Sequence, residues 1–291
     1  GWMYHGNLAA QMANFFLLKS VPILWSIRHS LYDLKYEKRM TARVIRLCAR
    51  FSYKPSKILY NAQVSARQHE DLGYCPEKTM VIPNGFDTNQ FAPSREARIQ
   101  IRNELGLEPG TPLIGLMARY HPMKDHENFF RAAASLFKTH PHVHFLLAGD
   151  NVDENNQTLF DLIKRIGNKE RVHLLGPRMD VHKITAALDV ATNSSFFGEA
   201  FSNAIGEAMS CGVPCVVTNV GDSAFLVRDT GRIVPPRDPD ALAMAWKNLL
   251  DLGWEGRRKL GDKARQRIIN HFSLDSVVAQ YESLYSRILR S

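Results

Sequence analysis

The chain has 291 residues, of which 45% are hydrophobic and 23% are charged, and it contains four cysteines. This length allows about two domains, and the composition is that of a globular protein, which excludes a disordered chain, a collagen-like repeat and a disulfide-rich miniprotein. Four cysteines are too few for a disulfide framework, so we expect a reducing, cytoplasmic compartment. The longest apolar run, from Leu8 to Leu24, is interrupted by polar residues and Pro22, so no transmembrane helix is predicted.

The net charge of +8 is concentrated in the first quarter of the chain. Residues 1–75 carry eleven Lys and Arg against four Asp and Glu, whereas the rest of the chain carries 26 against 25. The excess is densest from Lys35 to Lys57. It indicates an anionic partner, such as a membrane surface, a nucleic acid or a phosphorylated substrate, with a solvated helix face as an equally good explanation.

Short apolar runs alternate with amphipathic patterns along the first part of the chain. Residues 1–6 resemble the end of a buried strand that enters a loop. Three strands are predicted at 21–27, 57–61 and 79–82, and three helices at 7–18, 36–53 and 62–72. A polar linker follows these elements and extends to Ser94, a typical helix N-cap.

The alternation becomes cleaner after this linker. The predicted strands are 113–118, 143–148, 171–175, 190–193, 214–218 and 232–234. The predicted helices are 125–139, 157–166, 180–187, 202–210, 239–252, 257–271 and 274–289. Repeated strand–helix units imply a parallel sheet with helices on both faces.

We therefore expect an α/β protein with two doubly wound, Rossmann-like domains. Residues 84–273 form the complete second domain, whereas residues 1–83 hold only about three βα units and form a partial, truncated first domain. The C-terminal helix, at about 274–291, is expected to pack back on this first domain.

In doubly wound folds, ligands bind beyond the carboxyl ends of the strands, so the loops that follow strands are the candidate sites. Arg119 and Lys124 bracket one such loop, which opens a helix. An arginine fork, a lysine charge and a helix N-terminus together suit a diphosphate. Taken alone, two exposed cations on a surface loop explain this pattern better.

A second loop carries Glu199 and leads through Ser202, the expected N-cap, to Glu207 in a helix. Eight helical residues would separate the two carboxylates by about 12 Å. Glycosidases need about 5 Å or about 6.5–9.5 Å, so the pair suits two separate hydroxyl-bearing groups, such as a sugar and a ribose. The backbone N–H groups of Phe201, Ser202 and Asn203 could hold the phosphate between them.

The Glu-x7-Glu spacing from Glu199 to Glu207, followed by Ala208-Met209 and Cys211-Gly212-Val213-Pro214, resembles the signature of family 4 retaining glycosyltransferases of the GT-B fold. Four further stretches, in the expected order, support this resemblance over nearly the whole chain: 81–87, 119–124, 145–149 and 219–222. It implies two Rossmann-like domains that face each other across a cleft. It also implies sugar transfer with retention of configuration and without a metal ion or cofactor.

The resemblance assigns roles to individual residues. Arg119 and Lys124 would bind the donor diphosphate, Glu199 the donor sugar and Glu207 the ribose. Residues 201–203 would supply backbone contacts, and the loop with Arg178 and Met179 would lie against the base. His29 matches the histidine that reaches the donor sugar near the reacting centre, so the expected catalytic set is His29, Glu199, Arg119 and Lys124. His5, taken as a second strand-end histidine, and Arg28 are assigned to the acceptor side.

The family's Gly-rich loop, which contacts donor and acceptor, has no counterpart here, so the chain as given is expected to bind its donor but to transfer slowly or not at all. The favoured function is a glycosyltransferase that moves a sugar, with UDP as the favoured carrier, to a glycan or lipid-linked acceptor in cell-envelope polysaccharide synthesis. A membrane-surface acceptor suits the basic segment from Lys35 to Lys57 and a peripheral location at the inner face of the membrane. The alternatives are a non-catalytic nucleotide-sugar-binding module and, less favoured for want of a motif, a nucleic-acid-binding protein.

Overall fold

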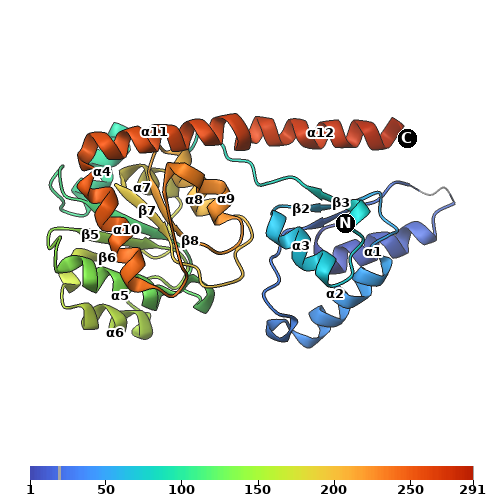
Figure 1. Ribbon diagram of the computed structural model, residues 1–291, viewed down its shortest axis with the longest axis horizontal. Coiled ribbons are helices and arrows are strands. Elements are labelled where there is room, and N and C mark those ends of the chain that lie inside the picture. Colours follow the sequence, from blue (N-terminus) through green and yellow to red (C-terminus); the bar gives the residue numbers. More distant parts are fainter. Residues whose placement is uncertain (19–20, 291) are drawn as a thin grey trace. The chain divides into compact units, whose positions relative to one another are not determined.

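The computed structural model describes residues 1–18 and 21–290, which divide into two compact units (Figure 1). Unit 1 contains residues 1–85, residues 198–201 and the chain from Leu274 onward, and unit 2 contains residues 86–197 and 202–273. Every strand pair in the described residues is parallel, and helices accompany both sheets, so the predicted α/β class is confirmed. The segment 198–201, which the sequence placed in the second domain, groups with unit 1.

Unit 1 is built on a sheet with the strand order β1-β2-β3. Alternate residues of each strand face opposite sides, so one face carries Trp25, Ile27, Ile58 and Tyr60, which pack with α1, α2 and α3. The elements of this unit are α1 (Met3–Phe15), β1 (Leu24–Ile27), η1 (Leu34–Tyr36), α2 (Arg39–Phe51), β2 (Lys57–Tyr60), α3 (Gln63–Asp71), η2 (Pro76–Lys78), β3 (Thr79–Val81) and α12 (Leu274–Arg290).

The other face of this sheet is covered by the last helix of the chain. Leu59 and Ile82 pack there against Val277 and Leu284 of α12. Gly85 lies against the first residue of this helix, since a Cβ at Gly85 would meet the Leu274 Cα at 3.0 Å. Both faces of the small sheet are therefore covered by helices that are remote from each other in sequence.

The start of the chain differs from the prediction. Residues 1–6 were expected to end a strand, but only Trp2 forms an isolated parallel bridge, to Ser26, and α1 begins at Met3. The side chain of Asn7 accepts a hydrogen bond from Ser26 N (3.2 Å) and donates to Ser26 O (3.3 Å). Ser26 N also donates to Gly1 O (3.1 Å), so Asn7 and the first residues of the chain together contact the edge of β1.

Unit 2 has a sheet with the strand order β6-β5-β4-β7-β8-β9 (Figure 1). The connections run in opposite directions from β4 and β7, which makes this central pair the topological switch point. Its elements are α4 (Arg95–Glu104), β4 (Leu113–Met117), η3 (Pro122–Lys124), α5 (His126–Phe137), β5 (His144–Ala148), α6 (Gln157–Ile166), η4 (Lys169–Arg171), β6 (Val172–Leu174), α7 (Val181–Ala187), β7 (Val190–Asn193), α8 (Asn203–Ser210), β8 (Cys215–Thr218), α9 (Ser223–Val227), η5 (Arg228–Thr230), β9 (Arg232–Val234), α10 (Pro239–Asp251) and α11 (Gly253–Phe272).

The predicted strands and most predicted helices of unit 2 agree with these bounds to within one to four residues. Ser94 caps α4 as expected, since its side chain accepts from Ala97 N. The short helix α9 was missed, because five residues are too few to show a helical period. Within residues 1–18 and 21–290, no helix combines the length and apolarity needed to cross a bilayer.

The helix α11 approaches the turn after α8 at a pair of glycines. A Cβ on Gly261 would overlap the carbonyl oxygen of Gly212, and Gly212 itself has a φ of +70°, which favours glycine. The two backbones are in contact here, with no room for a side chain on α11.

We expect Gly261→Ala to destabilise the protein by about 1–3 kcal/mol, because the added methyl group overpacks this contact. The measurement is the free energy of unfolding in denaturant. Gly110→Ala is the matched control, since a Cβ there meets nothing within 4 Å and its φ is not positive. Equal stability of the two variants would contradict the close contact.

Candidate functional site

The loop after β4 carries Arg119 and Lys124. Tyr120 N donates to Asp150 O (2.8 Å), and the 3-10 turn η3 then folds the loop back, with the His121 ring accepting from Met123 N at 3.2 Å. Asp125, at φ 49°, caps α5 by accepting from Asn128 N (3.2 Å). The two cations thus stand at the two ends of one folded loop, beside a helix start.

The positive charges of Arg119 and Lys124 both affect the ring of His121, which lies between them in the loop. Burial lowers the pKa of His121 first, and the positive charges of Arg119 and Lys124 lower it further. Arg119 is exposed and makes no ion pair with any residue that the structure describes. A positive region of this kind suits an anion.

The loop after β7 is joined to this cationic loop. Ser194 Oγ donates to Lys124 O (2.6 Å), and Phe196 N donates to Met123 O (2.8 Å). Because β4 and β7 are the two strands at the switch point, their loops diverge from neighbouring positions and leave room for a ligand. Two loops that are 70 residues apart in sequence are therefore held side by side.

Ser202 occupies the N-cap position of α8, but its side chain does not cap the helix, contrary to our expectation. Its hydroxyl instead accepts from Asn193 Nδ2 at 3.1 Å. The N–H groups of the first helical turn, which begins at Asn203, are therefore not satisfied by this hydroxyl. Such a helix start favours an anionic ligand.

Glu207 lies one turn further along α8 and is half-buried. Desolvation raises the pKa of its carboxyl group. No hydrogen bond or ion pair joins it to another residue in the described part of the chain, and a desolvated carboxylate is unfavourable without a hydrogen-bond donor. Glu207 can thus accept hydrogen bonds from a hydroxyl-bearing ligand.

The loop after β6 carries Arg178 and Met179. The Arg178 guanidinium forms two hydrogen bonds to Asp180, both 2.8 Å long, and further ones to Glu104, the shorter of which is 2.6 Å. These carboxylates raise the pKa of Arg178. Its side chain is therefore occupied within the protein, while Met179 is fully exposed at the tip of the loop.

His29 follows β1 in unit 1 and belongs to a chain of hydrogen bonds. Its Nδ1 lies 3.1 Å from the Tyr4 hydroxyl, which lies 2.9 Å from His69 Nε2, and His69 Nδ1 lies 2.7 Å from Ser65 O. Its Nε2 lies 3.5 Å from Glu37 Oε1. Burial lowers the pKa of His69 to about 4, so this ring is neutral.

The donors and acceptors in this series of hydrogen bonds determine which ring nitrogen of each histidine carries a proton. The carbonyl of Ser65 can only accept, so His69 carries its proton on Nδ1 and accepts from the Tyr4 hydroxyl at Nε2. The Tyr4 oxygen in turn accepts from Nδ1 of His29. Burial also lowers the pKa of His29, so the neutral ring presents an unprotonated Nε2. Sequence reasoning missed Tyr4, His69 and Glu37, which carried no motif.

Of the two residues assigned to the acceptor side, only His5 lies elsewhere than expected, since Arg28 directly follows β1. His5 lies within α1 and is exposed, so its assignment to a strand end was wrong. Arg28 donates to Asn84 Oδ1 and, at 3.3 Å, to the Tyr281 hydroxyl, and its guanidinium lies 5.5 Å from the centre of the Trp2 ring. These contacts give Arg28 a structural part in unit 1.

Glu199 and Phe201 belong to the short segment that groups with unit 1. Glu199 is buried, and it follows Gly198, whose φ of +69° requires a turn that favours glycine. The carbonyl of Phe201 accepts from Asn84 Nδ2 at 3.5 Å. Within residues 1–18 and 21–290, no three His, Cys, Asp or Glu residues are close enough to hold a metal ion.

Similar proteins share this combination of sheets and loops. An Escherichia coli UDP-Gal:alpha-D-GlcNAc-diphosphoundecaprenol alpha-1,3-galactosyltransferase is 29% identical over 96% of this chain and 71% of its own length. A Bacillus anthracis N-acetyl-alpha-D-glucosaminyl L-malate synthase is 28% identical over 66% of this chain. The chain spans 49% of the latter's length, and between 42% and 57% of that of several other curated relatives.

Solved structures show the same fold. The Anabaena protein Alr3699/HepE, in complex with UDP, matches with a TM-score of 0.86 and 25% identity over 98% of this chain and 78% of that one. Sucrose-phosphate synthase from Thermosynechococcus elongatus matches with a TM-score of 0.85 and 22% identity over 99% of this chain and 73% of that one. The family model described as glycosyl transferases group 1 matches residues 111–252. Residues 111–252 therefore resemble the group 1 glycosyltransferases, and the chain has the GT-B fold of its structural relatives.

Proposed function

We propose that this protein is a retaining glycosyltransferase that moves a sugar from a UDP-sugar to a glycan or lipid-linked acceptor in cell-envelope glycan synthesis. The observation that carries the proposal is the carboxyl edge of unit 2, where the desolvated carboxylate of Glu207, a cationic loop and the N-terminus of α8 follow the strands at the switch point. Its relatives support the donor and the acceptor, since HepE binds UDP and the E. coli enzyme is named for UDP-galactose and a diphosphoundecaprenol acceptor.

Each group of the donor has a matching group in unit 2. The carboxylate of Glu207 accepts from the ribose hydroxyls, and Arg119 and Lys124 neutralise the diphosphate together with the first turn of α8. The base lies against the backbone of the loop at Arg178 and Met179, because the arginine side chain is already bound to Asp180 and Glu104. These contacts stabilise the leaving group through fixed positive charge, so no metal ion is required for that purpose.

The sugar and the acceptor involve unit 1. The unprotonated Nε2 of His29 accepts a hydrogen bond from a donor-sugar hydroxyl, and Glu199 accepts another. In the transfer, the acceptor oxygen bonds to the anomeric carbon, the bond from this carbon to the diphosphate oxygen breaks, and the acceptor proton passes to that departing oxygen. Attack from the face that the diphosphate leaves retains the configuration.

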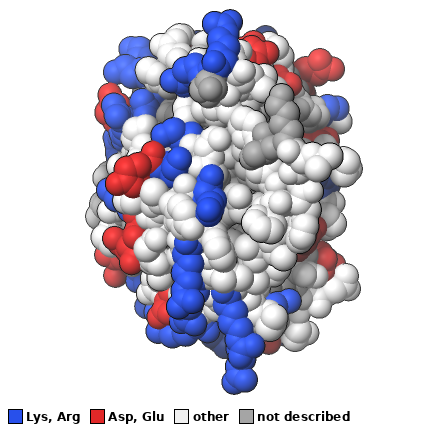
Figure 2. Space-filling view, turned by 90° about the vertical axis from the view of Figure 1, so that its right-hand side faces the viewer, with Lys and Arg blue, Asp and Glu red and all other residues white. Residues whose placement is uncertain are grey.

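The basic start of the chain supports a membrane-bound acceptor. On α2, Ala42, Ile45 and Cys48 face the core, so the arginines at 39, 43, 46 and 50 are exposed together with Met40, Leu47 and Phe51. Figure 2 shows Lys and Arg side chains gathered along one side of a face of the molecule, beside an uncharged area. A cationic helix face with apolar residues between its charges suits the surface of an anionic bilayer.

A second apolar feature adjoins the end of α2. Phe51 and Lys54 line a hollow together with Met12, Phe15 and Leu18 from the end of α1 and the chain beyond it. Phe15 is 84% exposed and Leu18 fully exposed. Large apolar side chains beside a cationic surface can enter the headgroup region of a bilayer.

Calorimetric titration tests the donor site. We expect Glu207→Gln to weaken UDP binding about ten- to a hundredfold at neutral pH, because a charge-assisted hydrogen bond contributes about 1.5–3 kcal/mol. In the unaltered protein, UDP affinity should fall as the pH falls through the raised pKa of Glu207, since only the carboxylate accepts both ribose protons, whereas Glu207→Gln should lose this dependence.

Two further variants serve as a control for Glu207→Gln and as a test of the sugar contact. Glu255→Gln, an exposed carboxylate on α11, should bind UDP as the unaltered protein does. Glu199→Ala should keep its UDP affinity and lose discrimination among UDP-sugars in binding and in transfer assays. Unchanged UDP affinity in Glu207→Gln would remove this residue from the site, and equal losses for UDP and UDP-sugar in Glu199→Ala would contradict its assignment to the sugar.

The hydrogen-bond chain of His29 is tested by Tyr4→Phe. We expect nitrogen NMR shifts to show the proton of neutral His29 on Nδ1 in the unaltered protein and a mixture of tautomers in the variant, because the acceptor of that proton is gone. Tyr53→Phe, which alters an exposed tyrosine of the same unit, should leave the tautomer unchanged. The same tautomer in Tyr4→Phe and the unaltered protein would contradict the assigned chain.

Vesicle sedimentation tests the membrane surface. The triple variant Arg43→Ala, Arg46→Ala and Arg50→Ala should lose about 100-fold or more of its binding to anionic vesicles at low salt, since each cation near an anionic leaflet contributes about 1 kcal/mol. The matched control replaces Arg131, Lys138 and Arg165, three exposed cations of unit 2, with alanine and should bind normally. Equal binding of the unaltered protein to neutral and anionic vesicles would refute the proposal.

A further inference from the structure

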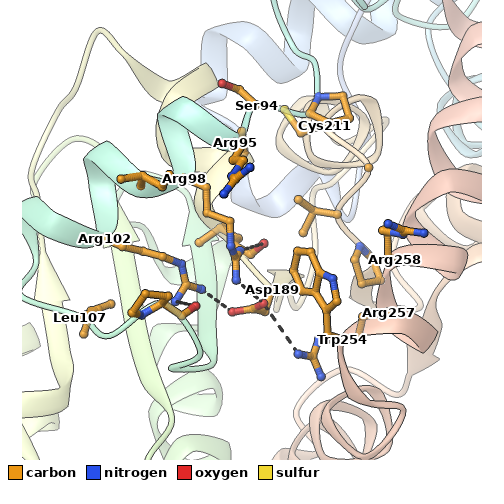
Figure 3. A pocket seen from close by; sticks show the side chains of 18 of the residues that line it. Ser94, Arg95, Arg98, Arg102, Leu107, Asp189, Cys211, Trp254, Arg257 and Arg258 are labelled. Atoms are coloured by element: carbon orange, nitrogen blue, oxygen red, sulfur yellow. Dashed lines mark hydrogen bonds and ion pairs between the residues drawn. The ribbon is translucent and has the colours of Figure 1, made fainter.

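Unit 2 contains a second cavity at the opposite edge of its sheet from the donor loops. Its volume is about 590 Å³, within the range of small-molecule sites. The residues Leu188 and Asp189 precede β7, Pro214 precedes β8, and all three line this cavity, which places it at the amino ends of the central strands. Helices α4 and α11 supply its other walls (Figure 3).

The cavity is strongly cationic. Five arginines line it, at positions 95, 98, 102, 257 and 258, against the two carboxylates of Asp189 and Asp262. Asp189 is buried and already accepts from Arg98 (2.8 Å), from Arg102 (2.6 Å) and from the backbone N of Leu113 (2.9 Å). One saturated carboxylate cannot neutralise the guanidinium groups around it, so the cavity retains an excess of positive charge.

Two buried donors in this cluster lack an acceptor. The Nε atoms of Arg102 and Arg257 are buried and form no hydrogen bond with any described residue, and Arg102 is 2% exposed. Burial lowers the pKa of both side chains, as expected where positive charges are desolvated together. An anion in the cavity would compensate the charge of both groups.

The outer part of the cavity presents two further arginines. Arg95 comes from α4 and Arg258 from α11, and within the described residues neither forms an ion pair or hydrogen bond (Figure 3). Figure 3 shows the two guanidinium groups on either side of Trp254, so they extend the positive region of the cavity along both helices, which favours an anion.

The remaining wall is apolar and includes an indole ring. Trp254 is 54% exposed at the start of α11, and the Arg98 guanidinium lies 4.9 Å from its ring centre. Leu107, Leu188 and Val213 complete this wall. An aromatic group can pack here against the indole while its charged end contacts the arginines.

We propose that this cavity is a second ligand site of the protein, separate from the donor site, and that it binds a small aromatic phosphomonoester. The phosphate contacts Arg95, while Arg258 adds positive charge from α11, and the aromatic body contacts Trp254 and the apolar wall. A free nucleoside monophosphate and a simple aryl phosphate share this chemistry. The proposal does not depend on the transfer reaction.

The test is a titration of the full chain with phenyl phosphate while saturating UDP occupies the donor site. We expect saturable binding by calorimetry and a change in tryptophan fluorescence that Trp254→Phe abolishes. The double variant Arg95→Gln and Arg258→Gln should lose at least tenfold in affinity with an unchanged melting temperature, since neither side chain holds other residues in place. Arg165→Gln, on α6 outside the cavity, is the control and should bind normally.

Further probes distinguish the contribution of the phosphate group to binding from that of the aromatic group. Inorganic phosphate should bind at least tenfold more weakly than phenyl phosphate, and adenosine monophosphate in place of phenyl phosphate identifies a nucleotide as the ligand if it binds more tightly. No saturable binding in the presence of UDP, full affinity in the double arginine variant, or equal affinity for inorganic phosphate would each overturn the proposal. Binding of UDP itself is measured separately, so this failure is distinguishable from a failure of the donor site.

Discussion

The contact between β4 and β7 is the constraint on which the rest of unit 2 depends. These two strands pair at the centre of the sheet, and the chain winds outward from them in both directions. Gly115 of β4 has no side chain, and a Cβ there would overlap the side chain of Leu188, which fills this space. A larger residue at position 115 would push the helix-to-strand connection away from the sheet. The packing of Leu188 against the sheet thus requires glycine at position 115.

Because β4 and β7 are parallel, their carboxyl ends lie at one edge of the sheet and their amino ends at the other, and the two edges have different roles. At the carboxyl end, the loops after β4 and β7 diverge and hold Lys124 next to Ser194. At the amino end, the single carboxylate of Asp189 joins α4 to β4 through Arg102 and Leu113 N. Removing one partner of a buried ion pair costs about 3–5 kcal/mol, so this end tolerates little change. The amino ends of β4 and β7 are therefore fixed by a buried ion pair, whereas the loops at their carboxyl ends form the proposed donor site.

The sequence predicted the order and type of most elements because buried parallel strands are short apolar runs between helical patterns. It failed where a local feature was overridden by a distant contact. Ser202 has the residue type of an N-cap, yet Asn193 Nδ2 uses its hydroxyl. Residues 1–6 have the apolar character of a strand end, yet Asn7 contacts the edge of β1 and a helix forms instead. Propensity describes neighbours in sequence, and both outcomes depend on neighbours in space.

The same limit applies to the candidate sites. Motif spacing singled out Arg119, Lys124 and Glu207, because they lie in, or shortly after, recognisable loops that follow strands. It could not identify Tyr4 and His69, which are 65 residues apart and meet only in space, through a hydrogen bond and a ring contact. Nor could it identify the arginine cavity, whose members come from two helices more than 150 residues apart in sequence.

The charged side chains of this protein fall into two kinds, those with an ion-pair partner and those without one. Groups that hold the fold are paired, as Asp189 is with three arginines and Arg178 with two carboxylates. Glu207 and Arg119 have no such partner among the described residues, and for Glu207 the cost of burial appears as a raised pKa. An unpaired, desolvated group lowers stability, so its presence at a loop edge requires a compensating gain. A ligand with hydroxyl donors and negative charge, such as the nucleoside diphosphate that we propose, would supply that gain at the carboxyl edge of unit 2.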